Sequence, residues 1–320
     1  MTLQIKNSRK IGVSLLSVLL VSGIILSAGR ETPVAAAVNT EQTTYATPEE
    51  AGKALESAAR ANDEAALAQI LGSESKAILS SGDSEEDKAA LASFVAKYAR
   101  MNRWVRLTDG SRILYIGADN YPYPIPLMQN ASSRWYFDTT AGKDEILARR
   151  IGKNELLAMD AVYAMGNAED LYFQHKHDDE TTHQYTQKIL SSPGRQDGLY
   201  WEVANDQRAS PLGRLDDFAN DVVSSTQPGP PPVLDGYSFR VLAAQGNHGN
   251  GKARNYVEDG AMTGGFAILA TPVTYGDAGI MTFMMSWERV VYQKDLGPRT
   301  TETAASINSY DPDHGWTQVK

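Results

Sequence analysis

The spacing of apolar residues along the chain changes from a helical period to a strand period near residue 104. Apolar residues three and four apart predict helices over 48–60, from about 62 to 71, and over 85–100. Thr47-Pro48-Glu49-Glu50 supplies a capping threonine, a proline at the first helical position and acids at the positive end of the first helix. From Trp104 the period becomes two, which predicts strands over 104–108, 112–116, 123–128 and 134–138.

This change of spacing predicts that residues 47–140 form an α+β domain, in which helices precede a curved antiparallel sheet. Asp109-Gly110 separates the first two strands and is a strong hairpin signal. The prolines at 122, 124 and 126 have no backbone N–H to donate in a hydrogen bond to a neighbouring strand. The third strand should therefore be irregular or lie at an edge of the sheet. By analogy of architecture this domain resembles the NTF2/cystatin-like fold.

The pattern over residues 143–320 predicts a second α+β domain, with one long helix packed on an antiparallel β-meander. The helix should cover 143–174, with Ala158, Val162, Met165 and Tyr172 on its core-facing side. A short helix is expected around 184–190, then strands over 237–244, 265–271, 280–286 and 290–294 and a helix near 300–308. This arrangement is similar to the globular head of pilin-like proteins.

The amino-terminal segment has the features of an export signal. Lys6, Arg9 and Lys10 precede an apolar run over 11–28, and small residues follow at Ala35-Ala36-Ala37. We expect a signal peptide over 1–37, a flexible tether over 38–46, and a periplasmic or secreted protein with no stable membrane insertion after cleavage. The alternative is an uncleaved membrane anchor, because the apolar run approaches the roughly 20 residues that span a bilayer.

Composition narrows the classes of function. The chain of 320 residues has no cysteine, which excludes disulfides, thiol nucleophiles and Cys-type zinc sites. Its formal net charge of −9 disfavours nucleic acid as a partner. Two glycine-rich segments, 246–251 and 260–265, lack phosphate-loop or dinucleotide spacing and predict hairpin loops. No cofactor is predicted.

Candidate catalytic residues gather near the predicted domain junction. Asp138, Arg150 and Glu155 lie there, together with Arg149 and Lys153. An acid whose ionisation is tuned by a buried arginine can act as a general base in a hydrolase. The alternative is an ion pair that locks two domains together, because no nucleophile or histidine accompanies the set.

Aromatic and histidine residues supply two further candidate sites. Tyr123, Trp135 and Phe137 are candidates to line a pocket for an apolar or sugar-like ligand, and their alternative role is core packing. A second group has metal-ligand chemistry, with a solvated connector as its alternative. That group comprises His175, His177, Asp179 and His183.

Several motifs together resemble a family of exported bacterial proteins known only as the domain of unknown function DUF2950. The motifs include Trp135–Thr139, Glu145–Leu156, Gly194–Trp201, Val291–Gly297 and Asp311–Asp313. Where that family usually has a glutamine late in the long helix, this chain has Glu169. Where its last hairpin usually turns on a glycine, this chain has Trp287-Glu288-Arg289. The resemblance implies no catalytic residues.

These observations predict an exported, non-catalytic binding or assembly module for an envelope protein or a small ligand. Two alternatives stay open. One is a hydrolase-type enzyme that uses the acids and arginines at the domain junction. The other is an accessory component of a pilus or secretion-like apparatus.

Overall fold

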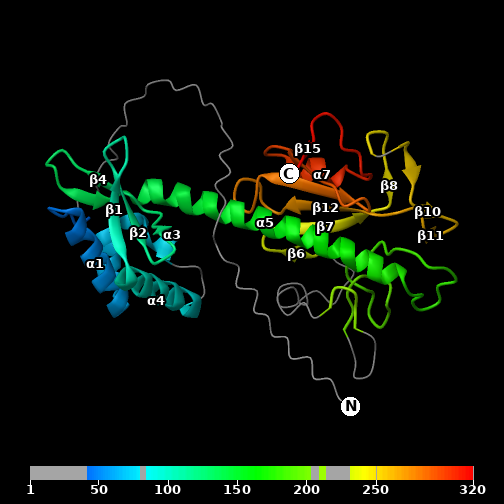
Figure 1. Ribbon diagram of the computed structural model, residues 1–320, viewed down its shortest axis with the longest axis horizontal. Coiled ribbons are helices and arrows are strands. Elements are labelled where there is room, and N and C mark those ends of the chain that lie inside the picture. The colour runs from blue at the N-terminus through cyan, green and yellow to red at the C-terminus, as the bar shows by residue number, and fades with distance from the viewer. Residues whose placement is uncertain (1–41, 80–83, 203–208, 214–230, 250, 320) are drawn as a thin grey trace, which may run out of the picture. The chain divides into compact units, whose positions relative to one another are not determined.

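A computed structural model describes residues 42–79, 84–202, 209–213, 231–249 and 251–319 (Figure 1). The predicted signal peptide over 1–37 lies outside this part of the chain, as does the tether up to residue 41. The chain divides into two compact units, 1–146 and 147–320, and the division falls inside the long helix α5, Thr139–Phe173. Within the described ranges, no helix is both long and apolar enough to cross a membrane.

The first unit combines helices with an antiparallel sheet, as the sequence predicts. Its helices are α1 (Pro48–Ala61), α2 (Glu64–Leu71), the 3-10 turn η1 (Ser73–Ser75), α3 (Lys76–Leu79) and α4 (Ser84–Arg100). Its strands are β1 (Asn102–Arg106), β2 (Arg112–Ile116), β3 (Tyr121–Pro122), β4 (Leu127–Gln129) and β5 (Trp135–Phe137). The strand order is β1-β2-β4-β5, and β3 pairs with β2.

Local chemistry accounts for the ends of several of these elements. Thr47 Oγ1 accepts a hydrogen bond from the Glu50 amide, and a Glu50 carboxylate oxygen accepts one from the Ala46 amide. Thr47 therefore caps α1 where the sequence predicts the helix to begin, and Glu50 in the first turn binds the amide of the residue before the cap. Pro124 and Pro126 lie between β3 and β4, so the strand predicted over 123–128 is interrupted.

The second unit places α5 on one face of an antiparallel meander (Figure 1). The sheet order is β15-β14-β13-β12-β7-β6. Its strands are β6 (Val233–Leu234), β7 (Tyr237–Leu242), β12 (Ala267–Pro272), β13 (Met281–Ser286), β14 (Val291–Asp295) and β15 (Thr317–Gln318). Between β7 and β12 lie β8 (Ala244–Gln245), β9 (Arg254–Asn255), β10 (Val257–Glu258) and β11 (Ala261–Met262). The α+β class is therefore confirmed.

Both faces of the central strands are covered. Ile268 in β12 pairs with Val241 and Met285, and Met285 reaches α5 at Gly166. On the other face, the Arg240 guanidinium donates to the Ala304 carbonyl of α7 (Thr300–Ala305). Because a strand buried on both faces has no polar side, β12 is an almost continuous apolar run.

The prediction of a short helix over 184–190 is wrong, because the structure has no helix in this segment. Tyr185 instead forms a bridge with Met262, and Leu190 forms one with Tyr200. The Thr186 amide donates to the Glu169 carboxylate rather than to a helical carbonyl. Contacts with α5 and the sheet therefore replace the local hydrogen bonds that a helix would have made.

Candidate functional site

The exposed side of α5 in the second unit carries large apolar residues. Its opposite side is buried in the core through Ala158, Ala161, Val162, Met165, Ala168 and Tyr172. Yet Leu156, Tyr163 and Leu171 are 46%, 43% and 49% exposed. Asp160, Ala164 and Asn167 lie between them and are also exposed. We call these six residues the α5 outer face.

Helical geometry brings these positions into line. At 100° per residue, the six fall within an arc of about 100°, opposite the buried stripe. From Leu156 to Leu171 the face extends about 22 Å along the helix, at 1.5 Å per residue. A single exposed leucine is ordinary on a protein surface. This face is distinguished by three large, exposed apolar side chains that share one side of the same helix.

A buried acid and an arginine join α5 to the last hairpin of the sheet. The Arg289 guanidinium donates to the Gly166 carbonyl and to the Asp170 carboxylate. Glu169 is fully buried, and its Oε2 accepts a hydrogen bond of 3.0 Å from the Thr186 amide. Burial raises the Glu169 pKa well above 4.5, and Asp170 adds to the rise, whereas the Thr186 bond and the Arg289 charge oppose it.

The position of the Arg289 side chain explains why a glycine, Gly166, lies in the middle of α5. A Cβ at Gly166 would collide with the Arg289 guanidinium and with the Met285 methyl group. The glycine therefore admits the arginine, at a helix-propensity cost of about 1 kcal/mol. Five buried side-chain polar atoms of the described residues have no hydrogen-bond partner, and two of them, Glu169 Oε1 and Arg289 Nη1, belong to these two residues.

The loop after α5 holds the histidines that the sequence suggested as metal ligands. The His177 ring is buried, stacks on Tyr172 with ring centroids 4.0 Å apart, and lies 3.1 Å from the Tyr172 carbonyl through Nε2. His183 Nδ1 lies 2.8 Å from the Phe173 carbonyl. His175 and Asp179 are exposed. Over the described ranges, no three His, Asp or Glu side chains are grouped so as to hold a metal ion.

The candidate catalytic residues each hold a structural partner. Asp138 belongs to the first unit and accepts a bond of 3.1 Å from the Ala141 amide at the start of α5. In the second unit, the Arg150 guanidinium pairs with Asp277 at the surface. Glu155 Oε1 accepts bonds of 2.9 and 3.0 Å from the Ile280 and Met281 amides at the start of β13. These bonds fix helix and strand ends, and the catalytic role stays a prediction.

The candidate ligand-binding aromatics lie in the core of the first unit. Trp135 and Phe137 are 7% and 1% exposed, and partly buried Tyr123 packs edge-on against Phe137 with ring centroids 6.3 Å apart. Arg112 lies over the Trp135 ring at 5.5 Å. The rings therefore fill the space between helices and sheet. Ligand binding by them stays a prediction.

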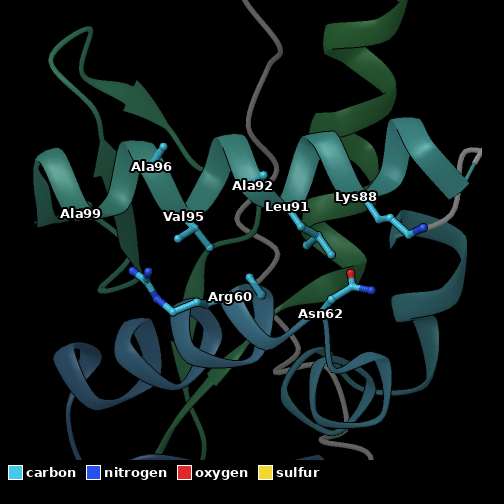
Figure 2. A pocket seen from close by; sticks show the side chains of 9 residues that line it. Arg60, Asn62, Lys88, Leu91, Ala92, Val95, Ala96 and Ala99 are labelled. Carbon is cyan, nitrogen blue, oxygen red and sulfur yellow. The ribbon is translucent and has the colours of Figure 1, made fainter.

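An open groove in the first unit runs between α4 and the end of α1. Figure 2 shows Leu91 and Val95 pointing from α4 toward α1, with Arg60, Asn62 and Lys88 around them. Arg60 pairs with Glu56, and Lys88 with Glu85. The floor is otherwise made of alanines, so the groove offers an apolar surface with its flanking charges neutralised.

Comparison with known proteins places the whole described chain in one family. Residues 42–319 match the family described as protein of unknown function (DUF2950). The chain belongs to this family. No curated protein and no solved structure matches the chain. The NTF2/cystatin-like and pilin-like resemblances therefore stay predictions.

In this DUF2950 protein, the motifs that carry the resemblance lie in the features described above. The last two residues of the motif Glu145–Leu156 belong to these features. Glu155 accepts hydrogen bonds from amides at the start of β13, and Leu156 is the first residue of the α5 outer face. The motif Gly194–Trp201 supplies the Gln196 carbonyl, which accepts a bond of 2.9 Å from the Tyr172 hydroxyl. Two departures from the pattern, Glu169 and Arg289, meet beside Gly166.

The sequence also contains a signal for the α5 outer face, which none of the candidate sites predicted above includes. The helical period that identifies Ala158, Val162 and Met165 as core residues also sets Leu156, Tyr163 and Leu171 on the opposite side. The signal was therefore present: a helix whose solvent side carries two leucines and a tyrosine has more apolar surface than packing on one sheet requires.

Proposed function

We propose that this protein is an exported, non-catalytic envelope protein that binds a partner protein through the α5 outer face. The observation that carries the proposal is the alignment of Leu156, Tyr163 and Leu171, each more than two fifths exposed, on one rigid helix. Apolar side chains on a rigid element bind with little loss of conformational entropy. Tyrosine also supplies a hydroxyl for the polar rim of an interface.

Packing and hydrogen bonds fix α5 on the sheet of the second unit. Its inner side is buried against β7, β12 and β13. Glu155 attaches it to the start of β13, and Arg289 attaches it to the hairpin that follows that strand. An element fixed at both ends presents its outer side chains in a constant geometry, which favours recognition of a partner.

Two further observations support the non-catalytic and exported parts of the proposal. The acids that the sequence suggested for catalysis are hydrogen-bonded to backbone amides. The amino-terminal basic residues, apolar run and alanines are typical of a signal peptide.

Capture from the envelope fraction tests the proposal. Tagged full-length protein is compared with a double variant, Leu156→Ser with Leu171→Ser, and with Val273→Ser as a control. Val273 is 43% exposed in the same unit and lies in the loop that follows β12, not among the six residues of the α5 outer face. We expect one protein to be retained by the unaltered chain and by the control, and lost from the double variant. Equal retention by all three would contradict the proposal.

A further inference from the structure

We propose that Arg289 is the moving part of a pH-dependent switch. It binds the exposed Asp170 while Glu169 is protonated, and it moves to bind Glu169 when that buried carboxyl loses its proton. The switch lies where α5 meets the turn between β13 and β14. It involves only residues of this chain, so it does not depend on what the α5 outer face binds.

In the structure, Arg289 binds the outer of two neighbouring acids. Its Nη2 donates to the Gly166 carbonyl and to the carboxylate of Asp170, whose side chain is 56% exposed. Glu169 is fully buried and accepts a bond through Oε2 from the Thr186 amide. Arg289 Nη1, a donor, and Glu169 Oε1, an acceptor, are both buried without a hydrogen-bond partner. An ion pair between Glu169 and Arg289 would therefore join two atoms that are now left without partners.

Gly166 places the arginine within reach of both acids. The Arg289 guanidinium lies directly against Gly166, because the missing side chain leaves room for it. Glu169 and Asp170 follow at the third and fourth positions, which are the neighbours of position 166 on a helix surface, about 5–6 Å away. Since Nη1 and Oε1 are not hydrogen-bonded, the guanidinium has to turn inward to join them, and this movement draws Nη2 away from Asp170.

The proton on Glu169 decides which acid the arginine binds. Burial raises the Glu169 pKa well above 4.5, so the carboxyl stays neutral over a range of pH in which an ordinary glutamate is ionised. A neutral carboxyl attracts the arginine only weakly, and the pair with Asp170 is then favoured. Once Glu169 is ionised, a buried carboxylate without a cation costs far more than an exposed one, because water hydrates the exposed group. The arginine should therefore follow the buried charge.

The other groups around Glu169 leave this choice to its own proton. Among the described residues, the titratable groups that act on it or that it acts on are Asp170 on α5, Arg289 on the turn after β13, and Tyr185. Burial raises the Tyr185 pKa above its ordinary value of 10, so this phenol stays neutral. Loss of the Glu169 proton then leaves Asp170 as a free carboxylate directly before Leu171. The charge beside the α5 outer face becomes more negative as pH rises.

A carboxyl titration and crystal structures at two pH values test the switch in the full-length protein. Nuclear magnetic resonance of protein labelled at its glutamate carboxyls gives the midpoint of Glu169, whose signal is the one that Glu169→Gln removes. Crystals are then equilibrated well below and well above that midpoint. We expect Arg289 to bind Asp170 in the acidic form and Glu169 in the alkaline form. In Glu169→Gln, which keeps the side-chain size and has no proton to lose, Arg289 should bind Asp170 at both pH values.

Three results would overturn the proposal. One is an alkaline form in which Arg289 still binds Asp170, whether or not it also contacts Glu169. Another is the same movement of Arg289 in Glu169→Gln, because the Glu169 proton would then not drive it. The third is a Glu169 signal that does not titrate between pH 5 and pH 9, because the acid would then have no charge to switch.

Discussion

Replacing Glu169 with glutamine removes a buried acid while it keeps the size of the side chain. Glu169 is fully buried, and one of its carboxyl oxygens accepts the Thr186 amide. The glutamine carbonyl can keep that bond. The substitution therefore isolates the effect of ionising a carboxyl inside the core of the second unit.

The sign of the pH effect follows from the raised pKa. Burial raises the Glu169 pKa above its ordinary value of 4.5, so the folded protein holds a proton that the unfolded chain releases. The free energy of unfolding must then fall as pH rises from about 4.5 up to the folded-state pKa. One proton corresponds to about 1.4 kcal/mol for each pH unit in that window.

Glu169→Gln carries no such proton, so its stability relative to the unaltered protein should rise with pH at up to about 1.4 kcal/mol per unit. Urea unfolding followed by tryptophan fluorescence at pH 5, 6, 7 and 8 measures this difference, since Trp201 lies in the core of the second unit. Glu258→Gln alters an exposed glutamate and serves as the control. A difference between Glu169→Gln and the unaltered protein that stays constant from pH 5 to pH 8 would refute the reasoning.

Three further predictions concern α5. Gly166→Ala should destabilise the protein by about 1–2 kcal/mol in urea unfolding, because its Cβ displaces the Arg289 guanidinium. Gly152→Ala, which meets open space in the same helix, should instead stabilise by about 0.5–1 kcal/mol, and equal effects would contradict this account. Glu155→Ala should cost about 1–3 kcal/mol by leaving the Ile280 and Met281 amides without their acceptor, and Glu155→Gln should cost less by the same measurement. Leu156→Ser with Leu171→Ser should change the unfolding free energy by less than about 1 kcal/mol, because both side chains are exposed; a larger loss would assign them to the core.

The sequence predicts most of the fold because its elements carry strong local signals. Thr47 and Pro48 define the start of α1, and the Asp109-Gly110 turn joins β1 to β2, with Gly110 at a positive φ of 91°. Strand β1 begins at Asn102, two residues before the predicted start. Polar Asn102 and Arg103 pair with Ile116 and Tyr115 without being buried, so hydrophobic alternation does not reveal them.

Other features depend on contacts between distant segments, which a local pattern does not contain. The segment around Thr186 is irregular because its amide and hydroxyl bond to Glu169 and to the Asp197 carbonyl. The histidine group predicted from residues 175–183 divides in the structure, because the His177 ring stacks on Tyr172 while His175 is exposed. Candidate sites inferred from proximity in sequence thus depend on how the loop folds back on the helix.

The central claim is that the α5 outer face binds a protein. Photo-crosslinking in intact cells tests it most directly, with a benzoylphenylalanine placed at Tyr163 and, as a control, at Val273. Both positions are more than two fifths exposed, so both probes reach solvent equally well. If the α5 outer face binds a protein, position 163 forms a discrete protein adduct that position 273 does not form. Illumination that yields no adduct from position 163, or the same adducts from both positions, would contradict it.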